Sequence, residues 1–399
     1  MNETRMTEST SALPLATSTW DDKEYAALDR VIASGRFTMG SAVKEFEQRF
    51  AEFFGTKYSV MVNSGSSANL LAVAAAVINP AIDLARGDEV IVPAVSWATT
   101  YYPLSQYGLT LKFVDVSIET LNMDLDEVEK AIGPRTKAVL AVNLLGNPVD
   151  YNRLRAICDS HGLLLIEDNC ESMGATLDGK HAGTFGAMGT FSSFFSHHIS
   201  TMEGGLIVTD DDYLYQAMIS MRAHGWTREL ADDNLIYPKT GDAFDDLFRF
   251  ALPGYNVRPL EMSGALGIEQ IQKLPSIVAG RRANAVDFVE RFSGRDDLSI
   301  QRETGESSWF GFAFILQGRL AGKRRDVVAA LTEATIESRP IVTGNFVRNP
   351  VLTHLEHADI GALPNADKLH DDGLFVGNHH FPIIDKLELL ERVIDSVRS

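Results

Sequence analysis

Two adjacent histidines are the candidate bases of this chain. His197 and His198 lie in a stretch of small and aromatic residues that leads to a Glu-Gly-Gly triplet at 203–205 and then to an apolar run typical of a strand. Histidine has an ordinary pKa of about 6.5, so it can take up and return protons near neutral pH. No lysine occurs between Lys180 and Lys239. This stretch therefore offers imidazole as a candidate base.

A turn rich in small residues is a candidate anion-binding site. Residues 58–62 form an apolar run that predicts a buried strand, and residues 63–69, Asn-Ser-Gly-Ser-Ser-Ala-Asn, lead from it into a helix rich in Ala and Leu. The free N–H groups and the dipole of a helix N-terminus favour a phosphate at such a turn. An ordinary strand–helix turn has the same pattern, and the residues alone leave both interpretations open.

Two other side chains follow predicted strands. Trp97 comes soon after the strand expected at 89–93, and Asp168 follows the one expected at 163–166. In α/β proteins, ligands bind beyond the carboxyl ends of the strands, which makes both residues candidates for ligand contact. Each also has a simpler interpretation, Trp97 as a core residue and Asp168 as the N-cap of a helix.

The elements that must position these residues form an alternating pattern. Short apolar runs alternate with helical stretches, as in βαβ units with a mostly parallel sheet. Further strands are predicted at 111–114, 138–142 and 312–316. Helices are predicted at 23–33, 42–54 and 325–334, and roughly over 259–292 with an irregularity at Pro275. The charged, irregular stretch 229–250 is expected to be a loop.

We expect three parts along the chain. Residues 1–11 are polar and are expected to form a flexible tail. Residues 12–260 hold the alternating pattern and the candidate site, and are expected to form a large ligand-binding domain. The long helix then links this domain to a small C-terminal domain, the two together covering residues 261–399.

Composition excludes several classes of protein. The chain has 399 residues, of which 45% are hydrophobic, and a formal net charge of −18, so nucleic acid and anionic membranes would be repelled. Its two cysteines form no disulfide framework and fit a reducing cytoplasm, and they are too few for a four-thiolate iron–sulfur cluster. The N-terminus lacks the apolar core of a signal peptide, and the apolar run 70–85 contains Asn, Pro and Asp, which favours a buried helix over a membrane span.

The histidine stretch resembles the DegT/DnrJ/EryC1/StrS family of sugar aminotransferases. Those proteins have Ser-Phe-x-x-x-Lys-Asn, with Glu-Gly-Gly six to eight residues after the lysine. Counting back six residues from Glu203 places His197 at the lysine position. The resemblance implies an α/β fold of the type I, aspartate aminotransferase-like class, with pyridoxal 5'-phosphate (PLP) as cofactor. It also implies a large, mostly parallel sheet domain and a smaller C-terminal α+β domain.

The resemblance implies a phosphate site shared by two subunits. Ser66 and Ser67 match the family turn that holds the cofactor phosphate, and Ser192 matches a family serine that bonds it. Gly-Tyr-Asn-Val-Arg at 254–258 matches a segment whose Asn reaches the phosphate of the neighbouring subunit. Asn256 therefore implies a homodimer with shared active sites.

Three residues are implied to act on the cofactor ring. Trp97 matches an aromatic residue that stacks on the pyridine ring. Asp168 matches the carboxylate that keeps the pyridine nitrogen protonated, so that the ring accepts electrons. Glu171 stands where the aminotransferases usually have His or Gln, a departure shared by the dehydratase branch of the family.

Three further residues are weaker candidates for substrate contact or support. His224 matches a family position that we expect in the active site, and Arg228 and Arg339 are candidate contacts for an anionic substrate. Each could equally be an ordinary surface residue.

The exchange of lysine for His197 implies a particular chemistry. Imidazole cannot form the stable imine by which lysine holds PLP, so the cofactor would be bound non-covalently, as PLP or as pyridoxamine 5'-phosphate (PMP). A base at this position would favour loss of the C3 hydroxyl of a 4-keto nucleotide sugar over amination at C4. That loss needs two electrons in net, and relatives take them from their own [2Fe–2S] cluster or from glutamate. With two cysteines, we expect glutamate as cosubstrate and no iron–sulfur cluster.

Three alternatives stay open. The first is an aminotransferase that uses another lysine, for example Lys180. The second is a 3-dehydratase that receives electrons from an external ferredoxin. The third is a cofactor-binding protein without catalytic activity.

Overall fold

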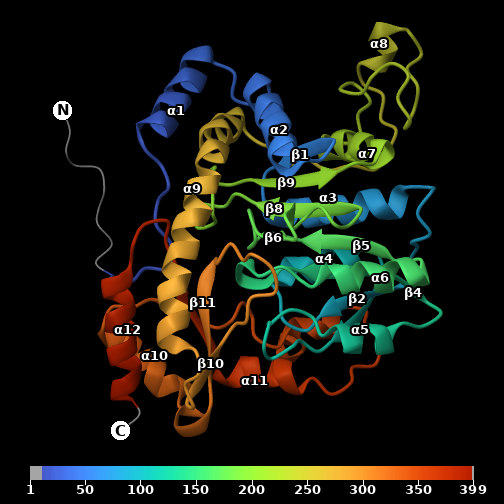
Figure 1. Ribbon diagram of the computed structural model, residues 1–399. Coiled ribbons are helices and arrows are strands. Elements are labelled where there is room, and N and C mark those ends of the chain that lie inside the picture. The colour runs from blue at the N-terminus through green and yellow to red at the C-terminus, as the bar shows by residue number, and fades with distance from the viewer. Residues whose placement is uncertain (1–10, 398–399) are drawn as a thin grey trace.

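The computed structural model describes residues 11–397. The tail expected at residues 1–11 therefore lies outside the described residues, apart from Ser11, whose hydroxyl donates to Thr335 O (2.7 Å). Figure 1 shows a large sheet with helices on its faces, a long helix beside it and a smaller sheet domain at the C-terminal end.

The large sheet has seven strands in the order β1-β9-β8-β5-β4-β2-β3. Their bounds are β1 (Tyr58–Val62), β2 (Glu89–Pro93), β3 (Thr110–Val114), β4 (Thr136–Val142), β5 (Leu164–Asp168), β8 (Met188–Ser192) and β9 (Gly205–Thr209). The pairs from β3 to β8 are parallel, whereas β9 pairs antiparallel with both β8 and β1. The mostly parallel sheet predicted from the alternating pattern is confirmed. A short hairpin of β6 (Thr176–Leu177) and β7 (Lys180–His181) lies beside it.

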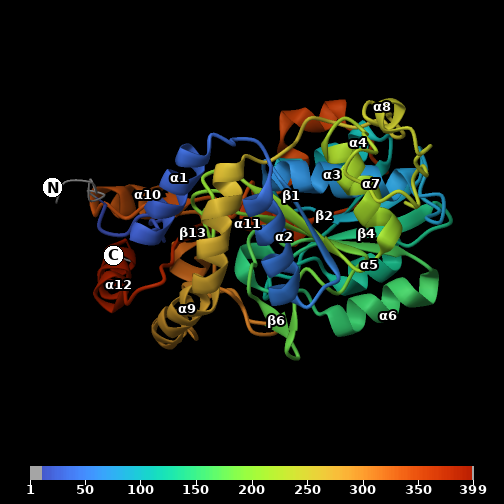
Figure 2. The same cartoon turned by 90° about the horizontal axis from the view of Figure 1, so that it is seen from above.

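Helices cover both faces of the large sheet (Figure 2). One face carries α3 (Gly65–Ile78), α4 (Ala98–Gln106) and α7 (Asp212–Arg222), and the other carries α5 (Leu125–Ala131) and α6 (Tyr151–His161). Alternate residues of a strand face opposite sides of the sheet. Val60 and Val62 of β1 accordingly pack with α3, while Met61 packs toward α2 (Ser41–Phe54). Burial on both faces explains why these strands are continuously apolar.

Helix α9 links the two domains. It runs from Glu261 to Phe292 and continues as a helix through Pro275, close to the predicted range. Its N-terminal half packs against α1 (Asp22–Ser34) and α2, and its C-terminal half contributes Phe288 and Phe292 to the core of the small domain.

The small domain is an antiparallel sheet with helices, so the predicted C-terminal α+β domain is confirmed. The sheet order is β10-β11-β13-β12. Its elements are β10 (Leu298–Ile300), β11 (Gly311–Leu316), α10 (Arg324–Glu333), β12 (Ser338–Arg339), α11 (Pro364–Asp372), β13 (Gly373–Gly377) and α12 (Ile384–Ser396). Leu13 is fully buried in this domain's core, although the prediction assigns it to the large domain. The division between residues 260 and 261 stays a prediction.

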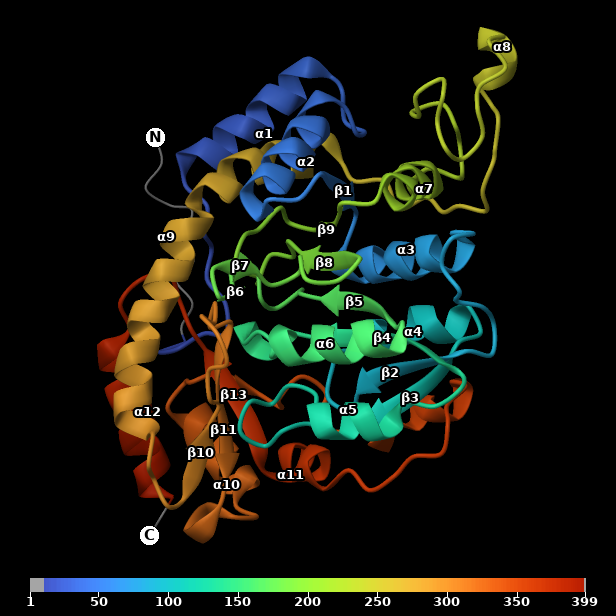
Figure 3. The same cartoon turned by 45° about the vertical axis from the view of Figure 1, so that its right-hand side comes forward.

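Residues 229–250 form an arm. It stands away from the sheet domain in Figures 1 and 3 and holds one short helix, α8 (Ala243–Asp246), within the stretch predicted as a loop. The side chain of Asp242 accepts from the N–H groups of Phe244 and Asp245, which starts this single turn.

None of the helices within residues 11–397 has the length and apolar character needed to span a membrane.

Candidate active site

A cavity of about 410 Å³ lies at the carboxyl ends of the central strands. Its wall is formed by the start of α3, the ends of β4, β5 and β8, and the 193–204 loop between β8 and β9. The small domain adds Val342. Six of the predicted site residues line this cavity: Ser66, Trp97, Asp168, Glu171, Ser192 and His197.

One end of the cavity is the N-terminus of α3. Ser64 caps the helix by accepting from Ser67 N (3.1 Å), and its hydroxyl also meets the hydroxyl of Ser67 (3.0 Å). Ser67 is thereby used by the cap and does not line the cavity. A Cβ on Gly65 would lie 2.7 Å from the Cβ of Ser192, so glycine lets the helix start approach this strand end. The first N–H groups of a helix lack intrahelical acceptors. Ser67 N is taken by the cap, whereas the first two helix residues, Gly65 and Ser66, line the cavity together with Ser192.

Asp168 is held on both carboxylate oxygens. Its Oδ2 accepts from Asn69 Nδ2 (2.8 Å) and Thr100 Oγ1 (2.8 Å), and its Oδ1 accepts from Cys170 N (3.2 Å). Donors on both oxygens fix the orientation of the carboxylate. Asp168 is the last residue of β5 rather than a residue beyond it, and no helix begins in residues 169–187, so the N-cap interpretation is wrong.

Trp97 is an exposed wall of the cavity. It precedes α4 as that helix's N-cap residue, and 59% of the residue is accessible to solvent. The core interpretation of Trp97 is therefore wrong. A large aromatic surface left open at a cavity is suited to stacking on a flat ligand.

Glu171 introduces a second carboxyl group. Its Oε2 accepts from Leu145 N (3.0 Å), and Leu145 adopts a left-handed backbone conformation with φ 52°. Burial raises the pKa of Glu171 to about 7; the Leu145 N–H opposes this rise, and the charge of Asp168 adds to it. Near neutral pH Glu171 is therefore able either to donate or to accept a proton.

The two histidines face different surroundings. His197 lines the cavity, with its ring centroid 5.2 Å from that of Phe310. His198 is fully buried, does not line the cavity, and its Nε2 lies 3.1 Å from Ser308 O. Among residues 11–397, Nδ1 of His197 has no hydrogen-bond partner. Of the two adjacent histidines, only His197 is therefore placed to act on a ligand in the cavity.

A buried arginine influences His197. Arg281 on α9 is 4% exposed and donates from Nη1 to the carbonyls of Trp309 (3.3 Å), Phe310 (3.0 Å) and Asn378 (2.9 Å). Within the described chain no carboxylate pairs with it. Burial, and then the charge of Arg281, lower the pKa of His197 to about 4. The imidazole is therefore neutral at pH 7, which is the form that accepts a proton.

Besides Ser67, four predicted residues do not line the cavity: His224, Arg228, Asn256 and Arg339. His224 has a left-handed backbone (φ 66°), and its N–H donates to Tyr255 O (2.6 Å). The guanidinium of Arg228 lies 4.2 Å from the centroid of the Trp226 ring. Asn256 is exposed and accepts from Arg258 Nε (2.9 Å), and Arg339 is exposed on β12. Their functional roles stay predictions.

Several residues of the site were missed from the sequence. Asn69 and Thr100 hold Asp168 in place. Asn69 is the last residue of the turn at 63–69, and Thr100 lies seven residues after the strand expected at 89–93, so both could have been proposed from their positions in the sequence. Glu203 lines the cavity and belongs to the motif triplet. No sequence pattern marked Val342, which has a left-handed backbone (φ 50°) and reaches the cavity from the small domain.

Lys180 is badly placed for the aminotransferase alternative. It lies on the exposed hairpin strand β7, and its Nζ is 4.8 Å from the ring centroid of Phe185. No lysine of the described chain lines the cavity. An amine able to bind a cofactor in this cavity is thus absent from residues 11–397.

Comparisons with known proteins agree with this geometry. The chain matches the DegT/DnrJ/EryC1/StrS aminotransferase family over residues 18–398. A curated relative named GDP-4-keto-6-deoxy-D-mannose 3-dehydratase, from Yersinia pseudotuberculosis, is 55% identical over 383 residues, which are 96% of this chain and 98% of the relative.

Two solved structures have the same fold as this chain. The E. coli GDP-4-keto-6-deoxy-D-mannose-3-dehydratase with bound hydrated PLP superposes with a TM-score of 0.94 and 53% identity, covering 96% of this chain and all of that one. A GDP-4-keto-6-deoxymannose-3-dehydratase with a trapped PLP–glutamate geminal diamine has a TM-score of 0.93 and 53% identity, covering 96% of this chain and 99% of the other. The predicted PLP-dependent aminotransferase-like fold is confirmed.

Proposed function

Because this chain belongs to the DegT/DnrJ/EryC1/StrS aminotransferase family, we propose that it is a nucleotide-sugar 3-dehydratase rather than an aminotransferase. It removes the C3 hydroxyl of GDP-4-keto-6-deoxy-D-mannose to give GDP-4-keto-3,6-dideoxy-D-mannose. The observation that carries this proposal is His197, which lines a cavity without lysine at the place of the family's lysine. The names of the relatives supply the guanine nucleotide and the sugar.

The residues of the cavity fit PLP or PMP held without a covalent bond. The start of α3, with Ser66 and Ser192, would hold the phosphate, the carboxylate of Asp168 would meet the pyridine nitrogen, and Trp97 would cover a ring face. When bound, the cofactor supplies an amine that condenses with the sugar ketone and a ring that accepts electrons. Asp168 favours that acceptance because its fixed negative charge stabilises a protonated ring nitrogen.

His197 acts as the base. Its neutral imidazole takes the proton whose loss allows the C3 hydroxyl to leave. Glu171, which titrates near neutrality and lines the same cavity, can donate a hydrogen bond to the cofactor or to the departing hydroxyl. Phe194 adds an aromatic side chain to the cavity wall beside the base, with its ring centroid 5.9 Å from that of His197.

Glutamate supplies the electrons. It converts PLP to PMP and leaves as 2-oxoglutarate, and the nitrogen is later released as ammonia when the unsaturated amine hydrolyses. The relative with trapped glutamate supports this source. Cys158 and Cys170 are free and lie on different segments, at α6 and after β5, which does not favour a cluster within the chain. The free thiols also support the proposed cytoplasmic location.

The first experiment combines the protein with GDP-4-keto-6-deoxymannose, PLP and glutamate. We expect a product one oxygen atom lighter by mass spectrometry, with 2-oxoglutarate and ammonia formed in equal amounts. Omission of glutamate is the matched control and should limit product to the PMP already bound. An aminated sugar would contradict the proposal, and turnover only with reduced ferredoxin would favour the ferredoxin-dependent alternative. Cofactor binding without any product would favour the non-catalytic one.

We also propose a homodimer with shared active sites. The arm exposes three phenylalanines, Phe244 (85%), Phe248 (63%) and Phe250 (56%), and so much exposed aromatic side chain on one short segment is unusual for a monomer. Asn256 follows the arm and is exposed rather than at its own chain's cavity. Both features support a second copy that covers the arm and receives Asn256.

Mixed dimers test the shared site. His197→Asn and Asn256→Ala should each be nearly inactive alone. A dimer that combines them has one site with both defects and one site with neither. Random mixing of equal amounts therefore should restore about one quarter of the parent's activity, measured after refolding or co-expression. Mixtures that are as inactive as the two single variants would place Asn256 in the active site of its own subunit.

A further inference from the structure

The loop that carries His197 is closed at its base by its own residues. Thr201 N donates to Ser193 O (2.9 Å), Ser193 N donates to Gly204 O (3.0 Å), and the two hydroxyls lie 2.6 Å apart. These bonds hold residues 193 and 201–204 together. They do not hold the tip, residues 194–200, in which His197 lies.

The tip is anchored at Ser200, three residues after His197. Ser200 N donates to Gln270 Oε1 (3.0 Å), and Ser200 O accepts from Trp20 Nε1 (2.9 Å). Ser200 is 5% exposed, so both polar groups of its main chain depend on these two side chains. The partners come from remote parts of the chain, Trp20 just before α1 and Gln270 on α9.

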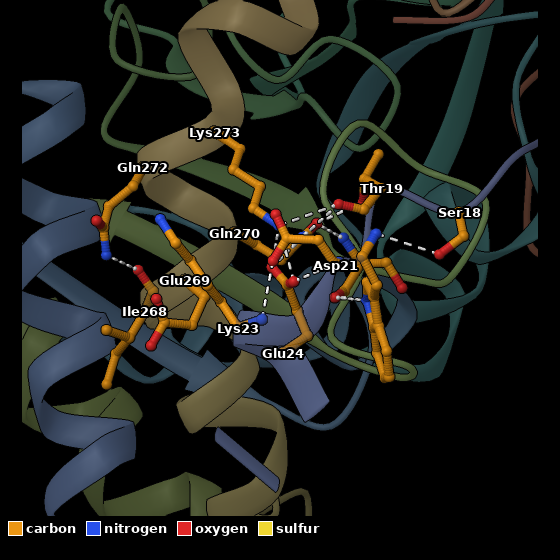
Figure 4. A network of polar contacts seen from close by, with 12 residues as sticks. Ser18, Thr19, Asp21, Lys23, Glu24, Ile268, Glu269, Gln270, Gln272 and Lys273 are labelled. Atoms are coloured by element: carbon orange, nitrogen blue, oxygen red, sulfur yellow. Dashed lines mark hydrogen bonds and ion pairs between the residues drawn. The ribbon is translucent and has the colours of Figure 1, made fainter. Parts of the chain in front are cut away.

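Gln270 is itself fixed in orientation. Its Nε2 donates to Glu24 Oε1 (2.7 Å) and to Thr19 O (3.1 Å), two groups that only accept. The amide oxygen must therefore point the other way, toward Ser200 N. Figure 4 shows Gln270 between Thr19 and Glu24, with Lys273 reaching the same carboxylate.

Other contacts of the tip do not replace this anchor. Ile199 is fully buried in the apolar cluster that includes Ile271 of α9, which sets the depth of the tip but not the direction of its peptide groups. His198 contacts Ser308 O through its ring nitrogen Nε2, which fixes its side chain rather than the main chain of the tip. A tip held at Ser200 and at His198 leaves His197 little freedom to move away from the cavity.

We propose that Gln270 and Trp20 are positioning residues that fix Ser200, and through it the loop tip, so that His197 stays aimed into the cavity. Neither residue lines the cavity. A base displaced by about 1 Å can lose about 100-fold in rate, so the anchor is expected to matter for kcat more than for binding.

Two variants each remove one of the two bonds to the main chain of Ser200, and Gln270→Leu also removes the bonds of Gln270 to Thr19 and Glu24. Trp20→Phe keeps an aromatic ring and removes the donor to Ser200 O, and Gln270→Leu removes the acceptor of Ser200 N. Lys273→Met is the matched control: it removes a donor to Glu24 in the same network but no contact of Ser200. If a variant acted only by lowering the stability of the network, Lys273→Met would show the same effects as the two loop variants.

The first readout needs no cofactor or substrate. Hydrogen–deuterium exchange of the apoprotein should show faster exchange at the Ser200 amide in Gln270→Leu, and in the peptide over 194–200 in both loop variants. Exchange there should be unchanged in Lys273→Met. Parent-like protection of that peptide in both loop variants would overturn the proposal, whatever reaction the protein catalyses.

The second readout rests on the proposed function. Both loop variants should lose about ten-fold or more in kcat, with KM for the nucleotide sugar and cofactor affinity within about two-fold of the parent. Lys273→Met should keep kcat within about two-fold even if its Tm falls. Equal kcat losses in all three variants, or none in the loop variants, would overturn the positioning role.

Discussion

Replacement of His197 by asparagine is expected to lower kcat for dehydration by about 10²–10⁴-fold. Asparagine is similar in size and polar, but its amide cannot accept a proton at neutral pH. The cofactor contacts proposed for Ser66, Ser192 and Asp168 do not involve His197, so cofactor affinity should stay close to that of the parent. Initial rates of 3-deoxy-ketosugar formation, together with a cofactor titration, measure both quantities.

His198→Asn is the matched control for this variant. His198 neighbours the proposed base in sequence, but its Nε2 points to Ser308 O and it does not line the cavity, so the shorter asparagine removes this one contact and leaves the cavity wall unchanged. We expect a loss of about ten-fold at most. Equal losses of kcat in the two variants would contradict the assignment of the base to His197. Full activity of His197→Asn would show that His197 is not the base.

The pH dependence should reflect the lowered pKa of His197. With a pKa of about 4, the ring stays neutral at pH 5.5, whereas a histidine of ordinary pKa would be about 90% protonated there. Protonation of His197 should therefore begin to reduce kcat only well below pH 5.5. His198 and Arg281 also face this ring, and Glu171 titrates near 7 in the same cavity. Measuring the pH dependence of kcat in Glu171→Gln removes the titration of Glu171 and leaves that of His197. A fall in kcat centred near pH 6.5 in that variant would contradict the lowered pKa of His197.

Replacement of Asp168 by asparagine should lower kcat by about 10²–10³-fold. Asparagine has the same shape but no negative charge to stabilise a protonated pyridine nitrogen. Its amide group would also meet the donors of Asn69 and Thr100, which now point at a carboxylate. Measurement of kcat for both half-reactions, the glutamate-driven one and the dehydration, should show losses in each because both need the electron-accepting ring.

A second buried aspartate provides the control. Asp115 follows strand β3, is as little exposed as Asp168 (6%), and accepts from the N–H groups of Asn365 and Ala366, but does not line the cavity. Asp115→Asn should lower the free energy of unfolding and leave kcat within about two-fold. If the two substitutions reduced kcat alike, the effect of Asp168→Asn would be structural.

The sequence alone determined the architecture and the type of chemistry. Alternating apolar runs predicted the parallel strands because a strand buried on both faces must be apolar along its length. The turn at 63–69 predicted the helix start at one end of the cavity. Together with the family resemblance, the absence of lysine near His197 favoured a dehydratase over an aminotransferase, since a covalent imine requires an amine. The alternative with Lys180 stayed open until the structure placed that residue away from the cavity.

Only the tertiary structure decided which groups meet. It placed His197 but not His198 at the cavity wall, gave Asp168 its donors and brought Val342 from the small domain. It also showed that Ser200 depends on Trp20 and Gln270. Periodicity and turn chemistry act over a few neighbouring residues, so they cannot register contacts between segments far apart in the chain. Burial and the charge of Arg281, which keep the base neutral, arise from the same packing and leave no local trace in the sequence.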